Sequence, residues 1–75
     1  IMLNSQSSDL TEVSNILGRS SNEINIFLEK YNLEANDLLI LLQAGDKRNY
    51  ALMILAAMQG NNKALRKLDN LLGFL

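Results

Sequence analysis

The sequence predicts an all-α fold, a compact bundle of about five short helices. Apolar side chains recur every three or four residues in successive short segments, which is the spacing of one helix face. No stretch shows the strict alternation of a half-buried strand, and the chain of 75 residues contains no proline. This length suits one domain. We therefore expect a single helical domain at residues 9–75, preceded by a flexible segment at residues 1–8.

The first helix is expected to begin at Asp9, since Glu12 three residues later can complete a capping box. Its apolar face would consist of Leu10, Val13, Ile16 and Leu17. We expect Gly18 to end this helix with a positive φ.

A second helix is predicted over residues 21–31. Ser20 and Glu23 repeat the capping-box spacing. The apolar residues at i, i+3, i+4 and i+7 are Ile24, Phe27, Leu28 and Tyr31. Asn32 and Leu33 interrupt this pattern.

The next helix, about residues 35–44, contains the apolar run "LLILL" at 38–42 and is expected to lie at the centre of the bundle. Gly45 is expected to end it as a left-handed C-cap. Asp46 can then cap a fourth helix, about residues 47–59, which Gly60 would end.

A fifth helix is expected to follow a cap at Asn61 or Asn62 and to end at Gly73. Its inward residues would be Leu65, Leu68 and Leu72. Its outward residues would be Lys63, Arg66 and Lys67. Phe74 and Leu75 are apolar and need cover.

The net charge of −1 hides an uneven distribution. Residues 1–37 carry two basic and six acidic side chains, a balance of −4, whereas residues 38–75 carry five basic and two acidic side chains, a balance of +3. A chain with this polarity can self-associate head to tail or present one basic face. Ordinary solvated surfaces that happen to segregate are the simpler interpretation.

The composition excludes several kinds of chemistry. Without cysteine or histidine the chain forms no disulfide, no zinc knuckle and no imidazole general base, and no glycine-rich phosphate loop is present. We expect neither enzymatic activity nor a cofactor. The apolar runs at 38–42 and 51–58 are far shorter than the roughly 20 residues of a membrane span, and the start "IMLNSQSSD" does not have the pattern of a signal peptide. A cytoplasmic protein that does not enter membranes is therefore predicted.

The segment "LTEVSNILGRSSNEINIFLEKY" has the features of a helix-turn-helix. Such a unit needs a small residue in its first helix, a glycine in the turn and apolar residues that fix the crossing of the helices. Ser14 and Gly18 meet the first two needs, and Val13, Leu17, Ile24 and Phe27 meet the third.

This spacing resembles the helix-turn-helix of the factor-for-inversion-stimulation (Fis) class, in which "LG" is followed at fixed intervals by two apolar residues and "KY". Here these are Leu17 with Gly18, then Ile24, Leu28, and Lys30 with Tyr31. The continuation, with Leu33, "ILLQAG" at 40–45 and Ala51 with Leu52, resembles the central domain of ParB-type partition proteins. The resemblance covers about residues 10–58 and implies binding of double-stranded DNA. Arg19 departs from it, because an apolar residue is usual there.

If the unit reads DNA, the bases would meet the face opposite the apolar stripe. Asn side chains can pair with adenine, and Ile26 can contact a thymine methyl group. The residues predicted to bind DNA are Arg19, Ser21, Asn22, Asn25, Ile26, Lys30, Lys63, Arg66 and Lys67. Alternatively, Ser21 serves only in capping and the asparagines are ordinary surface residues.

The second helix carries Glu23 and Glu29, and it has no basic residue before Lys30. Because phosphate contacts dominate affinity for nucleic acid, one such domain should bind weakly, and a homodimer is expected. The competing hypothesis is a protein-interaction module without DNA binding. In that case the acidic second helix and the basic fifth helix contact partner helices or each other, and Ile26, Phe74 and Leu75 form the apolar part of the contact.

Overall fold

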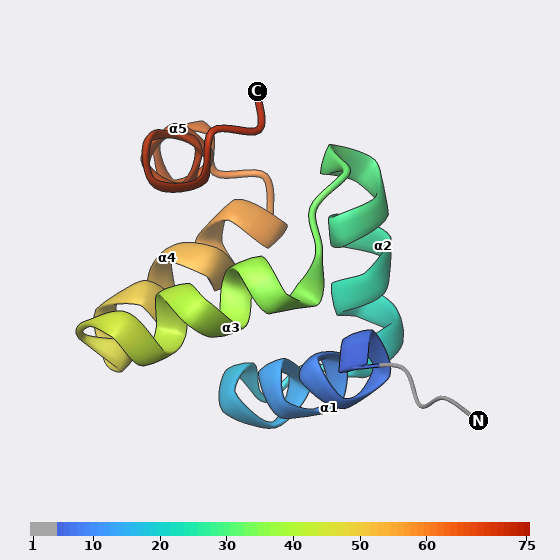
Figure 1. The fold of residues 1–75 in the computed structure, drawn as a ribbon. Coiled ribbons are helices and arrows are strands. Elements are labelled where there is room, and N and C mark those ends of the chain that lie inside the picture. Colours follow the sequence, from blue (N-terminus) through green and yellow to red (C-terminus); the bar gives the residue numbers. More distant parts are fainter. Residues whose placement is uncertain (1–4) are drawn as a thin grey trace.

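The computed structural model describes residues 5–75, and this part of the chain is built from helices without any strand (Figure 1). The all-α fold predicted from the sequence is thereby confirmed. The helices are α1 (Ser5–Leu17), α2 (Ser21–Tyr31), α3 (Ala35–Ala44), α4 (Lys47–Met58) and α5 (Asn62–Leu72).

Helix α3 lies at the centre of the bundle, as its apolar run predicts. It packs against α1 on one side and against α4 on the other, while α2 packs on α1 and α5 packs on α4. In Figure 1, α2 therefore stands at the right and α5 at the upper left, with α3 and α4 between them. Helices α2 and α5 do not pack against each other along their length.

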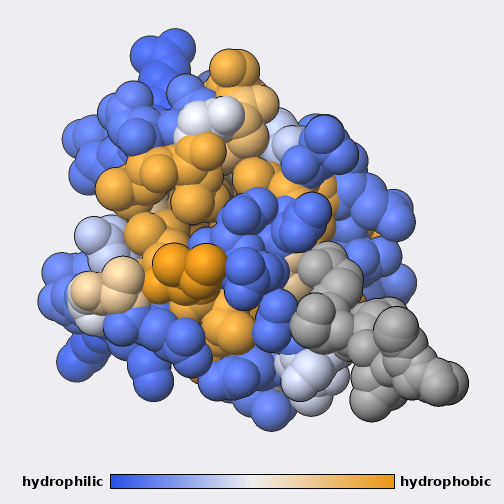
Figure 2. All heavy atoms as spheres, viewed as in Figure 1, coloured by the Kyte–Doolittle hydropathy of each residue, from blue (hydrophilic) through white to orange (hydrophobic). Residues whose placement is uncertain are grey.

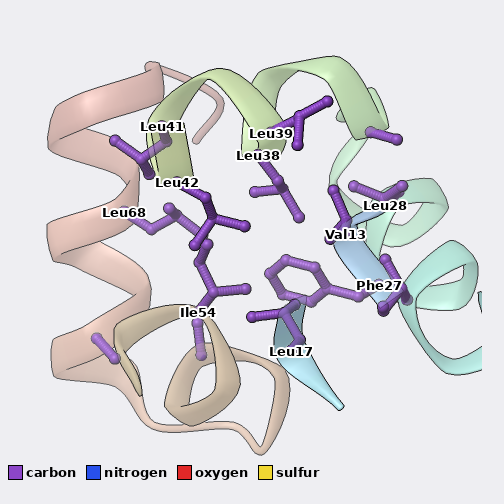
Figure 3. Packing of buried hydrophobic residues seen from close by; sticks show 14 residues of the cluster. Val13, Leu17, Phe27, Leu28, Leu38, Leu39, Leu41, Leu42, Ile54 and Leu68 are labelled. Atoms are coloured by element: carbon purple, nitrogen blue, oxygen red, sulfur yellow. The ribbon is translucent and has the colours of Figure 1, made fainter. Parts of the chain in front are cut away.

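One hydrophobic core joins all five helices. Its members are Val13, Leu17, Ile24, Phe27, Leu28, Ala35, Leu38, Leu39, Leu41, Leu42, Ile54, Ala57, Ala64 and Leu68. No polar side chain is buried among the described residues. Figure 3 shows that Phe27 of α2 and Leu68 of α5 point toward this core from opposite sides. Complete burial of each large side chain contributes about 1.5–3 kcal/mol.

The start of α1 differs from the prediction. The helix begins at Ser5, so Asp9 lies inside it and is not the N-cap. The residues before Asp9 include neither proline nor glycine that would stop a helix, and a cap-like pair within a helix does not by itself begin one. Of the predicted flexible segment, residues 1–4 lie outside the described part of the chain.

Three of the predicted N-caps are confirmed by hydrogen bonds. Backbone N–H groups three residues into the helix donate to Ser20 Oγ at 3.2 Å, Asp46 Oδ1 at 3.2 Å and Asn61 Oδ1 at 3.1 Å. The cap at Ser20 lacks the reciprocal bond of a capping box, because Glu23 accepts from the Ser20 hydroxyl instead of its backbone N–H. Such a bond is present at α3, where the Glu34 N–H donates to Asp37 Oδ2 at 3.0 Å.

One prediction about α3 was wrong. Gly45 does not adopt the left-handed conformation, since its φ and ψ are −149° and −139°. Its role is spatial: a Cβ atom at Gly45 would lie 2.8 Å from Cε2 of Tyr50. Ile40 is not part of the core but is 56% exposed, because α3 contacts neighbours on two sides and leaves a strip uncovered.

The C-terminal segment folds back from α5 toward α2. Gly73 ends α5 with φ 70°, and Asp69 Oδ1 then accepts hydrogen bonds from the N–H groups of Phe74 at 2.9 Å and Leu75 at 2.7 Å. This turn brings the Phe74 ring edge-on to Tyr31, with centroids 5.4 Å apart. Phe74 therefore has the cover that its apolar side chain needs, whereas Leu75 remains 68% exposed.

Candidate interaction surfaces

The turn between α1 and α2 has the geometry that the sequence predicts. Gly18 has φ 68°, and its N–H donates to the carbonyl oxygen of Ser14 at 2.9 Å. The Ser14 hydroxyl donates to the carbonyl oxygen of Arg19, so the small residue of α1 reaches across the turn. The direction in which the chain enters α2 is thus set by local hydrogen bonds.

Burial of the apolar positions orients α2. Val13 and Leu17 of α1 and Ile24 and Phe27 of α2 are all buried, as predicted for the contact between the two helices. The opposite side of α2 is therefore directed to solvent. Its exposed residues are Asn22, Glu23, Ile26, Glu29 and Lys30, and we call the first four of them the acidic face below. Ser21 and Asn25, at its edge, are half-buried.

Both carboxylates of the acidic face accept hydrogen bonds from neutral neighbours. Ser20 Oγ donates to Glu23 Oε1 at 3.2 Å, and Asn25 Nδ2 donates to Glu29 Oε2 at 3.3 Å. Neither contact neutralises the negative charge. The amide of Asn25, a predicted base-reading group, is turned toward Glu29.

A groove runs beside the acidic face, between α2 and the C-terminal end of α4. Its volume is about 370 Å³. Its apolar wall includes Ile26, Phe27, Tyr31, Leu55 and Met58. Three predicted DNA-binding residues, Arg19, Ile26 and Lys30, line this groove, and Lys30 Nζ lies 5.5 Å from the centre of the Tyr31 ring.

The contribution of α4 to this groove was not predicted from the sequence. Leu55 and Met58 follow an apolar pattern that indicates only an inward face. The available signal was Ile26, an apolar residue on an otherwise polar helix face, and it is 59% exposed.

The outward side of α5 carries the remaining predicted cations. Lys63, Arg66 and Lys67 are exposed, and we call them the basic face. They form no hydrogen bond or ion pair with another described residue. The carboxylate of Asp69, the acidic residue of α5, accepts hydrogen bonds from backbone N–H groups of the C-terminal segment.

The acidic and basic faces lie on opposite sides of the molecule. Leu28 of α2 and Leu68 of α5 point toward the shared core from two sides (Figure 3). Residues on the far side of each helix consequently point away from each other. The basic face of α5 therefore does not lie beside the predicted DNA-reading residues of α2. The basic side chains near those residues are Arg19 and Lys30.

Apolar surface is also exposed over the other helices. Figure 2 shows it extending from the C-terminal end of the chain over α4 and α3. The exposed large apolar residues outside α2 are Ile40, Leu52, Leu71 and Leu75. They come from α3, α4, α5 and the C-terminal segment, so no helix among these three is fully covered.

Comparison with protein families, curated proteins and solved structures finds no match to this chain. No helix in the described residues is long and apolar enough to cross a membrane. Residues 5–75 likewise contain no group of three acidic side chains placed to hold a metal ion.

Proposed function

We propose that this domain is an oligomerisation module that binds a second copy of the same chain. The acidic face of α2 in one copy would contact the basic face of α5 in the other. The observation that carries this proposal is the placement of these two faces on opposite sides of one molecule, where they cannot neutralise each other. The cations of α5 have no partner among the described residues, and the carboxylates of α2 have only neutral ones.

Charge alone would hold two copies together only weakly. An exposed ion pair contributes about 0.2–1 kcal/mol, and salt screens it. Ile26 on the acidic face and Leu71 on α5 add apolar area at about 25 cal/mol per Å². Against these gains stands the loss of rotational and translational freedom on association. We therefore expect weak, salt-sensitive association in which charge selects the orientation.

Analytical ultracentrifugation at low and high salt tests the proposal. The reversal Lys63→Glu with Lys67→Glu should abolish association at low salt, and mixing with a Glu23→Lys, Glu29→Lys variant should restore it. Lys47→Glu with Arg48→Glu is the matched control, since it changes the net charge equally at exposed residues of α4. Association that the control weakens as much as the α5 variant would show a general charge effect and contradict the proposal.

Binding of duplex DNA by α1 and α2 is a second candidate function. The Gly18 turn and the exposed Asn22 favour it, in line with the resemblance to the Fis and ParB-type helix-turn-helix. The negative charge of Glu23 and Glu29 and the remote position of the α5 cations oppose it.

Fluorescence anisotropy with a pool of duplexes at low salt tests this second candidate. If DNA is the ligand, Asn22→Ala should remove the preference among sequences. Replacing Lys63, Arg66 and Lys67 with Gln should weaken all complexes and flatten their salt dependence, provided that these residues contact phosphates. Absence of binding at high micromolar protein would rule the candidate out.

A further inference from the structure

The placement of the two charged faces restricts the symmetry of any assembly that uses them. In a two-fold symmetric dimer the same surface patch is used by both copies. A patch of this kind would have to contain both the acidic face and the basic face. Figure 3 shows Leu28 of α2 and Leu68 of α5 pointing toward the core from two sides. Residues on the outer sides of the two helices therefore point away from each other, so one partner copy cannot cover both faces.

We propose that copies of this chain join head to tail into an open chain, with α5 of one copy seated on α2 of the next. This inference rests on the proposed function and specifies its geometry. Each added copy leaves a free acidic face at one end and a free basic face at the other. Such a contact is heterologous, and it continues until a ring closes or the supply of copies ends.

Both helices place an apolar residue beside their charges. On α5, Lys63, Lys67 and Leu71 follow one another at intervals of four residues and therefore lie in one row. Leu71 is 48% exposed at the end of this row. On α2, Ile26 lies between Glu23 and Glu29 along the chain and borders the groove of about 370 Å³.

The groove beside α2 is the site where this row of α5 residues from the next copy would bind. A leucine side chain entering it would contact Ile26, Phe27 and Met58. Lys63 and Lys67 of the same copy would then face the carboxylates of Glu23 and Glu29. A second copy of the chain thus supplies an apolar residue for the groove and cations for Glu23 and Glu29, in addition to Arg19 and Lys30, which already line the groove.

The test uses two variants in which one face is made neutral and polar. The α2-blocked variant carries Glu23→Gln, Ile26→Asn and Glu29→Gln. The α5-blocked variant carries Lys63→Gln, Lys67→Gln and Leu71→Asn. All six positions are exposed, so circular dichroism should show that both variants keep the fold. A variant with Lys47→Gln, Arg48→Gln and Leu52→Asn removes two cations and one exposed leucine from α4 and serves as the matched control.

Sedimentation at low salt should show that the average mass of the unaltered chain rises steadily with concentration and passes that of a dimer. The control should behave in the same way. Each blocked variant alone should remain monomeric. An equimolar mixture should form heterodimers and stop there, because only one acidic and one basic face remain intact in each pair.

The alternative outcomes separate this inference from the proposed function. An average mass that levels off at two copies, with salt sensitivity and charge-swap rescue retained, would overturn the open chain but leave the oligomerisation module standing. A chain that is monomeric at all concentrations would overturn both. Mixtures of the blocked variants that stay monomeric, while the unaltered chain assembles, would show that other surfaces form the contact.

Discussion

Helices α2 and α5 have the same length of 11 residues, a polar N-cap and a left-handed residue after the last turn, yet they are anchored differently. The buried residues of α2 are Ile24, Phe27 and Leu28, all large. Those of α5 are Ala64 and Leu68, only one of them large. Two helices of equal length with similar caps therefore differ in the size of the side chains that they bury. The helix with the cations depends on one leucine, the packing of its half-buried residues and the turn at its end.

Truncation of Phe27 or Leu68, the largest buried side chain of each helix, should have the largest effect on stability. It would test the difference in burial between α2 and α5. Phe27→Ala should lower the free energy of unfolding by about 3–5 kcal/mol, and Leu68→Ala by about 2–5 kcal/mol, through lost burial and the cavity left behind. Urea unfolding followed by circular dichroism measures both. We expect Leu68→Ala also to reduce the Phe74–Tyr31 contact, because it loosens α5. A Leu68→Ala variant of unchanged stability would contradict the assignment of this residue as the anchor of α5.

Substitution of the glycines that precede α2 and α5 should lower stability by similar amounts. Gly18 precedes the N-cap of α2 with φ 68°, and Gly60 precedes the N-cap of α5 with φ 95°. A Cβ atom at either position would meet open space, so only the backbone conformation opposes a side chain. Gly18→Val and Gly60→Val should each cost about 1–3 kcal/mol, measured by thermal unfolding. A tolerated valine at one position alone would show that this turn can rearrange.

The N-caps provide the smallest and finest comparison. Ser20→Ala and Asn61→Ala should each reduce stability by about 1 kcal/mol, since each removes an acceptor for a backbone N–H. The cost at Asn61 should be the greater, because its bond to Ala64 is partly buried whereas that of Ser20 is exposed. The urea midpoints of the two variants, compared at unchanged m-values, show which of the two is less stable. Equal midpoints would indicate that burial of the cap is unimportant here.

Local signals explain how much of the fold was predictable. The spacing of apolar residues and the caps at Ser20, Asp46 and Asn61 gave the bounds of α2 to α5 to within about one residue. Gly18 was predictable because a glycine after the last turn of a helix commonly ends it in the left-handed conformation. The early start of α1 was missed because Asp9 and Glu12 imitate a capping box within a longer helix.

The remaining features depend on the relative placement of helices. Gly45 faces the ring of Tyr50, and Ile40 is exposed only because no neighbour covers that side of α3. The groove requires Ile26 and Met58, residues 32 positions apart in the chain, to meet. The uneven charge was visible in the sequence, but its division between two opposite faces was not. The predicted roles of Asn22 and the α5 cations in DNA binding stay predictions.

The ring of Tyr31 has a practical consequence for experiments in solution. It lies edge-on between Phe27 and Phe74, with centroids 5.2 and 5.4 Å away. The chain has no tryptophan and only one other tyrosine, Tyr50, which makes no ring contact with the described residues. Magnetic shielding by the flanking rings should therefore distinguish the Tyr31 proton signals from those of Tyr50. Without any label, an NMR spectrum of this domain should report whether the C-terminal segment is docked.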